Sequence, residues 1–195
     1  MIRRAAIGDV AEVNPSVPRD LAAHPERKVS FVPMAYLSEE GFIARTEERT
    51  FAQVCKGYTY FARGDVIVAK ITPCVENGKA AYVDALPHDI GFGTTEFHVL
   101  RPGPEVEGRY LFYMIWNPHF RFLAARNMTG SAGQRRVPAD FVRRFTIPLP
   151  PLEEQKRIAA ILDQADAIRR KLRQALHETD TLLSTLVQRA FRGEL

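Results

Sequence analysis

The stretch PPLEEQKRIAAILDQADAIRRKLRQALHETDTLLSTLVQRAFRGEL occupies residues 150–195 and decides how the chain is organised. Small or apolar side chains recur through it at alternating intervals of three and four residues, which is the a/d pattern of a coiled coil. The residues of this seam are Ile158, Ile161, Ala165, Ile168, Leu172, Ala175, Thr179, Leu182 and Leu186. Leu162, Leu176 and Leu183 each follow a d position directly and widen the apolar face. We therefore predict one long helix that offers apolar surface to more than one neighbour.

Both ends of this helix carry residues that favour helix ends. Pro151 suits the first turn, where its missing N–H costs nothing, and Glu153 complements the positive end of the helix dipole. Gly193 suits the exit from the helix. From Leu152 to Phe191 the helix would be roughly 60 Å long, too long for a domain of about 150 residues to cover. We expect a partner helix to cover the seam.

Length and composition fit one globular domain followed by an appendage. The chain has 195 residues, of which 46% are hydrophobic, enough for a sizeable core. No apolar run approaches the ~20 residues of a membrane span, and the N-terminal sequence MIRRAAIGDVAEVNP lacks the apolar core of a signal peptide. We expect a cytoplasmic protein that does not enter a membrane.

The cysteines and histidines do not suggest a metal or disulfide framework. Cys55 and Cys74 are far apart in the sequence and form no CxxC pair, so we predict that both are buried free thiols. The five histidines are scattered without ligand spacing. We expect no metal site.

Positive charge is concentrated in one segment. The whole chain has a formal net charge of +4. Residues 121–144 carry six arginines against the single carboxylate of Asp140, a difference of +5. A polyanionic partner would therefore bind most favourably near this segment.

The remaining sequence predicts an α+β fold in which a mainly β globular domain, residues 1–149, precedes the long helix of residues 150–195. The predicted strands are residues 29–35, 58–61, 66–71, 79–83, 95–100 and 145–149, with the second and third forming a hairpin. Gly91-Phe92-Gly93 is expected to be a kink before a strand. A helical period over residues 110–122, interrupted by Asn117-Pro118, predicts two short helices.

The loop from Thr129 to Arg136 is the first candidate for a functional surface. Its glycines and Ser131 permit close approach of the backbone to a ligand, and Gln134, Arg135 and Arg136 follow. Arginine can bind guanine with two hydrogen bonds, and glutamine can bind adenine in the same way. The competing interpretation is a glycine turn with solvated arginines.

Two further loops are weaker candidates. One runs from Lys70 and Thr72 to Lys79, with an ordinary β-connection as its competing interpretation, and the other contains Thr94 and Thr95. Together with Arg126 of the basic segment, these residues complete the predicted DNA-binding set: Lys70, Thr72, Lys79, Thr94, Thr95, Arg126, Ser131, Gln134, Arg135 and Arg136.

No motif in the chain predicts catalysis. Asn117-Pro118-His119-Phe120 is similar to the Asn-Pro-Pro-aromatic box of adenine methyltransferases, but it lacks the second proline and no cofactor loop accompanies it. Gly91-Phe92-Gly93 is not followed by a helix with the Lys-Ser/Thr of a nucleotide loop. We do not expect an enzyme.

Several short motifs occur in an order that is typical of one family. They are Gly8-Asp9-Val10-Ala11-Glu12-Val13, Phe31-Val32-Pro33-Met34, Phe61-Ala62-Arg63-Gly64-Asp65-Val66, Lys70-Ile71-Thr72-Pro73, Thr95-Glu96-Phe97-His98-Val99-Leu100-Arg101-Pro102 and Thr129-Gly130-Ser131-Ala132-Gly133-Gln134. The most specific are residues 147–163, IPLPPLEEQKRIAAILD, and residues 186–195, LVQRAFRGEL. With these motifs the chain resembles the DNA-specificity subunits of type I restriction-modification systems.

The resemblance implies a function and a set of partners. Such subunits usually carry two target-recognition domains, each followed by a conserved helix, and the two helices pair antiparallel. This chain has one domain and one helix, so it is either a natural half-subunit that forms a homodimer or half of a longer product. The resemblance implies reading of a bipartite double-stranded DNA target, with docking of methyltransferase subunits and a restriction subunit. S-adenosylmethionine, Mg and ATP are expected in those partners only, and this chain is expected to bind no cofactor. The alternative is a coiled-coil scaffold whose basic loop does not read DNA.

Overall fold

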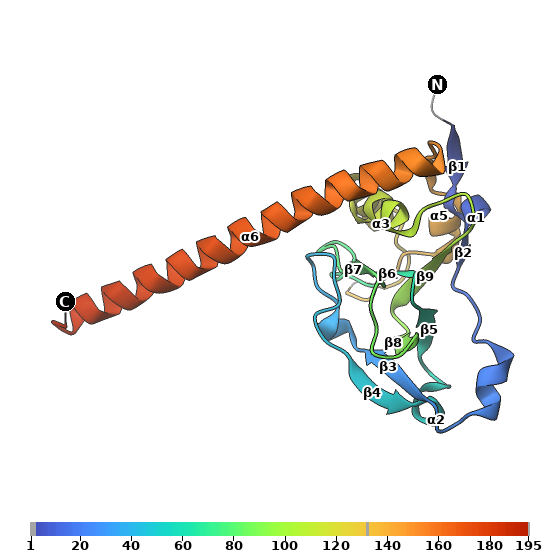
Figure 1. Cartoon of the computed structure of the whole chain (residues 1–195), viewed down its shortest axis with the longest axis horizontal. Coiled ribbons are helices and arrows are strands. Elements are labelled where there is room, and N and C mark those ends of the chain that lie inside the picture. The colour runs from blue at the N-terminus through green and yellow to red at the C-terminus, as the bar shows by residue number, and fades with distance from the viewer. Residues whose placement is uncertain (1–2, 132, 195) are drawn as a thin grey trace. The chain divides into compact units, whose positions relative to one another are not determined.

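A computed structural model describes residues 3–131 and 133–194 (Figure 1). The chain divides into two compact units, one ending at Lys156 and the other beginning at Arg157. The first unit is a mixed globular fold and the second is part of a single long helix. The predicted α+β class is confirmed.

Ten strands form the globular unit together with short helices. The strands are β1 (Arg4–Ala6), β2 (Ala11–Val13), β3 (Lys28–Val32), β4 (Glu47–Thr50), β5 (Thr59–Ala62), β6 (Val66–Ala69), β7 (Ala80–Tyr82), β8 (Ile90–Gly93), β9 (Phe97–Pro102) and β10 (Thr146–Pro148). The helices are α1 (Ile7–Val10), η1 (Arg19–Ala23), η2 (Met34–Tyr36), α2 (Phe51–Val54), α3 (Gly108–Trp116), α4 (Pro118–Arg126), α5 (Ala139–Arg144) and α6 (Leu152–Phe191).

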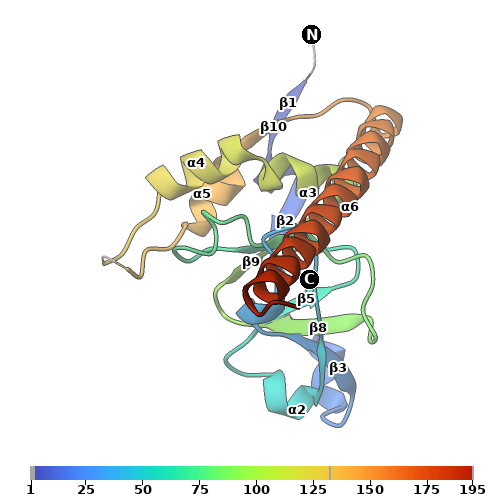
Figure 2. The same cartoon turned by 90° about the vertical axis from the view of Figure 1, so that its left-hand side faces the viewer.

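Two four-stranded sheets enclose the main core. One has the strand order β2-β9-β6-β7 and is antiparallel throughout, whereas the other has the order β4-β3-β8-β5 with a parallel β3–β8 pair. Their facing side chains, including Val32, Phe61, Ile67 and Phe97, form one buried cluster. A second cluster packs Leu21 of η1 and Phe51 of α2 with the β4-β3-β8-β5 sheet. Helices α3, α4 and α5 gather at the other end of this unit (Figure 2).

The predicted kink at Gly91-Phe92-Gly93 is wrong, because these residues lie in β8 at the centre of a sheet. A Cβ atom on Gly91 would lie 2.2 Å from the ring of Phe61, and one on Gly93 would lie 2.5 Å from the ring of Phe97. Glycine is needed here because two aromatic rings occupy the space of the missing side chains.

The predicted hairpin of residues 58–61 and 66–71 is also wrong, because β5 and β6 belong to different sheets. The chain crosses between the sheets at Gly64, whose φ of +90° suits glycine, and at Asp65. The buried Asp65 carboxylate accepts a hydrogen bond from the Ala62 N–H at 2.8 Å and two from the Arg101 guanidinium at 2.7 and 2.9 Å. A turn motif therefore predicted the change of direction but not the change of sheet.

The predicted break at Asn117-Pro118 is confirmed, since α3 ends and α4 begins there. The Asn117 side chain accepts a hydrogen bond from the Phe120 N–H at 2.9 Å and so caps α4, which is the structural role of the Asn-Pro-His-Phe motif. Helix α5 was not predicted. Cys55 is exposed and Cys74 is half-buried, so the thiols are free as predicted but not buried.

Helix α6 spans the predicted residues, Leu152–Phe191. Its first turn belongs to the globular unit, because the buried Gln155 amide accepts from the Glu107 N–H at 2.9 Å and donates to the carbonyls of Glu105 and Pro150 at 3.0 and 2.8 Å. The predicted boundary between residues 149 and 150 lies just before this turn. Among the described residues, no helix has the length and apolarity to span a membrane.

The apolar seam of α6 is largely uncovered in the single chain. Ile161, Ala165, Ile168, Leu172, Ala175, Leu176, Thr179, Leu182, Leu183 and Leu186 are exposed, and Ile158 and Leu162 are half-buried. Leu172, for example, retains 66% of its accessible surface. An exposed apolar stripe of this extent is typical of a surface that packs against another element.

Candidate nucleic-acid interface

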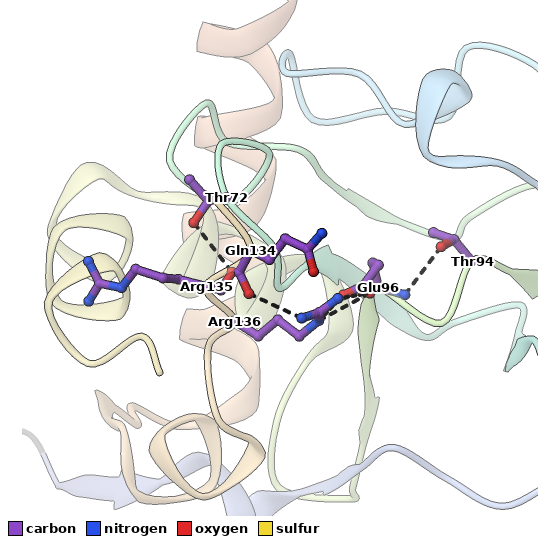
Figure 3. Close-up of polar contacts among 6 residues, drawn as sticks. All are labelled: Thr72, Thr94, Glu96, Gln134, Arg135 and Arg136. Atoms are coloured by element: carbon purple, nitrogen blue, oxygen red, sulfur yellow. Dashed lines mark hydrogen bonds and ion pairs between the residues drawn. The ribbon is translucent and has the colours of Figure 1, made fainter. Parts of the chain in front are cut away.

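Three segments that were predicted as separate candidates meet in the globular unit (Figure 3). The Val137 N–H donates to the Lys70 carbonyl at 2.8 Å, and the Thr72 N–H donates to the Arg135 carbonyl at 3.1 Å. The Lys70 N–H in turn donates to the carbonyl of Glu96 at 2.9 Å. Residues 70–72, 94–96 and 134–137 therefore lie together, although the three segments are far apart in the sequence.

The basic glycine loop is closed at its base. Thr129 and Arg136 exchange two backbone hydrogen bonds, at 2.8 and 3.0 Å, and the Gln134 N–H donates to the Ser131 carbonyl at 3.0 Å. Gly130 has a φ of +114°, a backbone conformation that residues other than glycine rarely adopt. Ser131 and Gln134 are exposed at the tip. The described part of the loop thus presents polar groups outward.

Arg136 is paired with Glu96, a contact that the sequence did not predict, and DNA contact by Arg136 stays a prediction. Its Nε and Nη2 atoms donate to the Glu96 carboxylate at 2.8 to 3.1 Å, and Nη1 donates to the Gln134 carbonyl at 3.1 Å. These hydrogen bonds hold the pKa of the Glu96 carboxyl below its ordinary value. Glu96 was not among the residues predicted for the site. An acidic residue two positions before His98, directly before a strand, was the available signal of a polar network. The Glu96–Arg136 pair acts as a clamp on the loop.

Arg135 extends to the side opposite Arg136 (Figure 3). Its Nη2 donates to the Met128 carbonyl at 2.9 Å, and the residue remains exposed. The Thr72 hydroxyl donates to the Arg135 carbonyl at 3.3 Å and so supports this part of the loop. Within the described residues Arg135 forms no ion pair, which leaves its charge available to an anion.

The two predicted lysines lie in different surroundings. Lys70 is half-buried beside the clamp, and this burial lowers the pKa of its ammonium group. The Lys79 ammonium donates to the carbonyls of Met34 and Leu37 at 3.1 and 3.0 Å, so it ties its strand to the η2 segment. DNA contact by either lysine stays a prediction, and for Lys79 it would require loss of these two bonds.

The other predicted residues are exposed or take part in local turns. The Thr94 hydroxyl accepts from the Glu96 N–H at 3.2 Å and shapes the turn, whereas Thr95 is exposed. Arg126 is exposed at the end of α4, with its guanidinium 5.5 Å from the centre of the Phe122 ring. The structure brings Thr94 close to the loop, and Arg126 lies on the helix that leads into it.

A buried histidine anchors the segment that leaves the loop. The ring of His98 lies 2.8 Å from the Val137 carbonyl through Nε2 and 3.2 Å from the Asn14 amide through Nδ1. Burial lowers the pKa of His98 to about 4, so the imidazole is neutral at pH 7. A neutral ring donates one of these bonds and accepts the other.

Comparison with known proteins decides the family. A family model described as "Type I restriction modification DNA specificity domain" matches residues 4–178. The chain belongs to this family. Its members in this comparison include the "Type I restriction enzyme EcoAI specificity subunit" of Escherichia coli, 39% identical over 184 residues that cover 91% of this chain and 31% of that subunit. The EcoEI specificity subunit of the same species is 38% identical over 199 residues, covering 97% and 33%. The chain therefore spans about a third of the length of these curated relatives.

Solved structures of type I specificity proteins have a similar fold. The HsdS subunit from Thermoanaerobacter tengcongensis matches with a TM-score of 0.68 and 25% identity, over 94% of this chain and 47% of that one. A chain from a structure described as "Structural basis underlying complex assembly and conformational transition of the type I R-M system" matches with a TM-score of 0.77 and 26% identity, over 97% and 48%. The resemblance stated from the sequence motifs is confirmed.

Proposed function

We propose that the globular unit reads one short half-site of double-stranded DNA and that α6 pairs with a second such helix. Pairing would join two readers in one assembly and give a bipartite target with an unread spacer. In a homodimer the helices would run antiparallel and the two half-sites would form an inverted repeat. Pairing with a second helix of a longer product would permit two different half-sites.

The observation that carries the reading function is the projecting loop of a type I DNA specificity domain. Its tip exposes Gln134 and Arg135, side chains that can recognise adenine and guanine through two hydrogen bonds each. The ion pair between Arg136 and Glu96 holds one end of the loop in the free protein. A preformed loop loses less conformational entropy when it binds.

The observation that carries the assembly function is the exposed stripe of α6. Ile168, Leu172 and Leu176 each keep 60% or more of their accessible surface in the single chain. Residues Leu162, Leu176 and Leu183 widen the stripe beyond a two-helix seam. We propose that the second helix covers part of it and that methyltransferase subunits dock on the rest, with the restriction subunit joining that assembly.

In this proposal the chain itself does no chemistry. S-adenosylmethionine, Mg and ATP would bind to the methyltransferase and restriction subunits, and the complex would act on DNA in the cytoplasm. The chain would direct DNA methylation to its target sequence.

Mapping methylated sites in the DNA of the source cell, with and without this gene, tests the proposal. We expect a bipartite methylated motif that disappears on deletion and returns with the wild-type gene. Complementation with Gln134→Ala/Arg135→Ala, which leaves the Arg136 clamp in place, should fail to restore that motif. An unchanged set of methylated sites after deletion would contradict the proposal, and full complementation by the variant would favour a scaffold whose loop does not read DNA.

A further inference from the structure

Part of the positive charge near the loop is already paired within the chain. Of the six arginines in residues 121–144, Arg136 is paired with Glu96 and Arg143 with Asp140 at 2.7 Å. Arg121 reaches the Glu76 carbonyl. Proteins that bind DNA tightly neutralise several phosphates, and each contact contributes to the salt dependence of affinity. Phosphate contacts are therefore expected from guanidinium groups that have no ion pair among the described residues, such as that of Arg144, and from cations close to them.

An open groove of about 570 Å³ lies at the base of the loop. It is lined by Arg4, His119, Leu123, Asn127, Pro138, Asp140, Phe141, Arg144, Phe145 and Thr146. Arg4, Arg144 and His119 provide three nitrogen-bearing side chains that can donate to an anion. The carboxylate in the lining, Asp140, is already engaged by Arg143. The groove thus carries unbalanced positive charge.

The groove has firm walls. Helices α4 and α5 lie side by side in Figure 2, and the rings of Phe120 and Phe145 pack edge to face with centroids 4.9 Å apart. The ring centroids of Phe120 and Phe141 are 5.9 Å apart. The Arg4 guanidinium donates to the Thr146 carbonyl at 3.1 Å, which fixes its position at one edge. A charged group whose side chain is already held, as that of Arg4 is, loses little entropy when it binds.

The groove is continuous with the reading loop. Asn127 and Pro138, which flank residues 128–137, both line it. The exposed Arg135 bonds to the carbonyl of Met128, directly beside Asn127. A ligand in the groove would therefore lie next to any DNA bases contacted at the loop tip.

We propose that this groove binds the phosphate backbone of the DNA duplex whose bases the loop reads. Arg4 and Arg144 contact phosphate oxygens, and the imidazole of His119 can donate a further hydrogen bond. The inference rests on the proposed reading function. Phosphate contacts position a duplex without recognising its sequence, so the groove contributes affinity and register, not base preference.

The test measures binding of two duplexes across a range of salt concentrations. One duplex carries a sequence enriched by the wild-type chain from a random pool, and the other has a random sequence. Arg4→Gln/Arg144→Gln should weaken binding to both duplexes by the same factor. Its slope of log affinity against log salt should be shallower by about 0.9 for each lost contact. The enriched sequence should remain preferred to the same degree.

Arg19→Gln is the matched control. Arg19 is exposed on η1, which lies at the other end of the globular unit from α5, and it forms no ion pair within the described residues. Because it removes one charge, it is compared with Arg144→Gln alone. Thermal unfolding shows whether each variant folds. If Arg144→Gln does not fold, Arg144→Lys is measured in its place, and because it keeps the charge it should retain the wild-type salt slope.

The outcomes separate the groove from the reading function. If the wild-type chain enriches no sequence, the proposed function fails, while the random duplex still reports on the groove. If the wild-type chain selects a sequence but Arg144→Gln binds as Arg19→Gln does, the groove proposal is wrong. A changed base preference with unchanged salt slope would also overturn it.

Discussion

The globular unit and helix α6 use their side chains in opposite ways. In the globular unit, charged groups such as Asp65, Lys79 and Arg136 are engaged by partners in the same chain. In α6, apolar groups such as Leu172 are exposed to solvent in the single chain. Charged side chains in a loop can thus serve to hold the fold together through ion pairs and hydrogen bonds. A periodic apolar stripe that is exposed in the single chain indicates a surface for packing against another element.

The first test of this difference removes the charge of a buried side chain in the globular unit. Asp65→Asn should destabilise the globular unit by about 3–5 kcal/mol, because it leaves Arg101 without its bidentate partner at a buried site. Urea unfolding followed by circular dichroism measures this loss. Glu105→Gln, which breaks the exposed ion pair with Arg3, should cost less than about 1 kcal/mol. Equal effects of the two changes would show that burial does not distinguish these pairs.

The second test places a charge in the α6 seam. Leu172→Asp should dissociate the paired helices, because an unpaired carboxylate would enter an apolar contact. Light scattering at micromolar concentration should give twice the 22.0 kDa chain mass for the wild type and the mass of one chain for the variant. His177→Asp, five positions further on the opposite side of the heptad, makes the same charge change and should leave the mass unchanged. A wild-type mass of one chain would exclude the homodimer.

A third test uses pH to sharpen the description of the globular unit. The pKa of His98 is lowered to about 4 in the folded protein from 6.5, so below pH 6.5 the unfolded chain binds a proton that the folded chain does not. Stability should therefore fall as pH falls from 6.5 towards 4, with His98 accounting for about 1.5 kcal/mol between pH 6.5 and 5. Lys70 and Arg143 oppose protonation of the ring, and Glu96 favours it.

The control for this pH dependence is His98→Gln. Its amide can donate to the Val137 carbonyl but does not titrate, so the variant should lose stability less steeply over that interval. Carboxylates with lowered pKa, including Glu96, lose their contribution below about pH 4.5 and so act outside it. Parallel stability curves for wild type and variant would contradict the assignment of a buried neutral His98.

The fourth test, with the smallest expected effect, asks whether Arg136 holds the loop through Glu96 or contacts a base directly. If Glu96 and Arg136 act as one clamp, Glu96→Gln, Arg136→Gln and the double variant should each lower the ratio of specific to random DNA affinity by a similar factor, about tenfold. If Arg136 reads a base directly, Arg136→Gln alone should be costly and Glu96→Gln nearly neutral. Anisotropy titrations of the four proteins give the cycle. Glu48→Gln, which removes a carboxylate that pairs with Lys28, controls for net charge.

Helix α6 was predictable from sequence because its signal is local. A run of 3-4 spacings, a proline at the start and a glycine at the end are enough to define Leu152–Phe191. The break between α3 and α4 was predictable for the same reason, since Asn117 and Pro118 act within one turn. Local rules do not need knowledge of what packs against the segment.

The sheet arrangement and the clamp depend on distant residues and could not be predicted in this way. Gly91 was interpreted as part of a kink because the aromatic ring that requires it, that of Phe61, lies thirty positions earlier in the sequence. The pairing of Arg136 with Glu96 was not predicted, because Glu96 is forty positions away. Residue type identified the loop as polar and basic, but only the fold shows which of its charges are already paired.

The most direct test of the central claim, that this domain reads DNA, is selection from a random pool of duplexes by the purified chain, followed by sequencing. We predict enrichment of one short motif by the wild type and its loss with Gln134→Ala/Arg135→Ala. Enrichment of no motif at low salt by a folded wild-type chain, or enrichment of the same motif by the variant, would contradict the account.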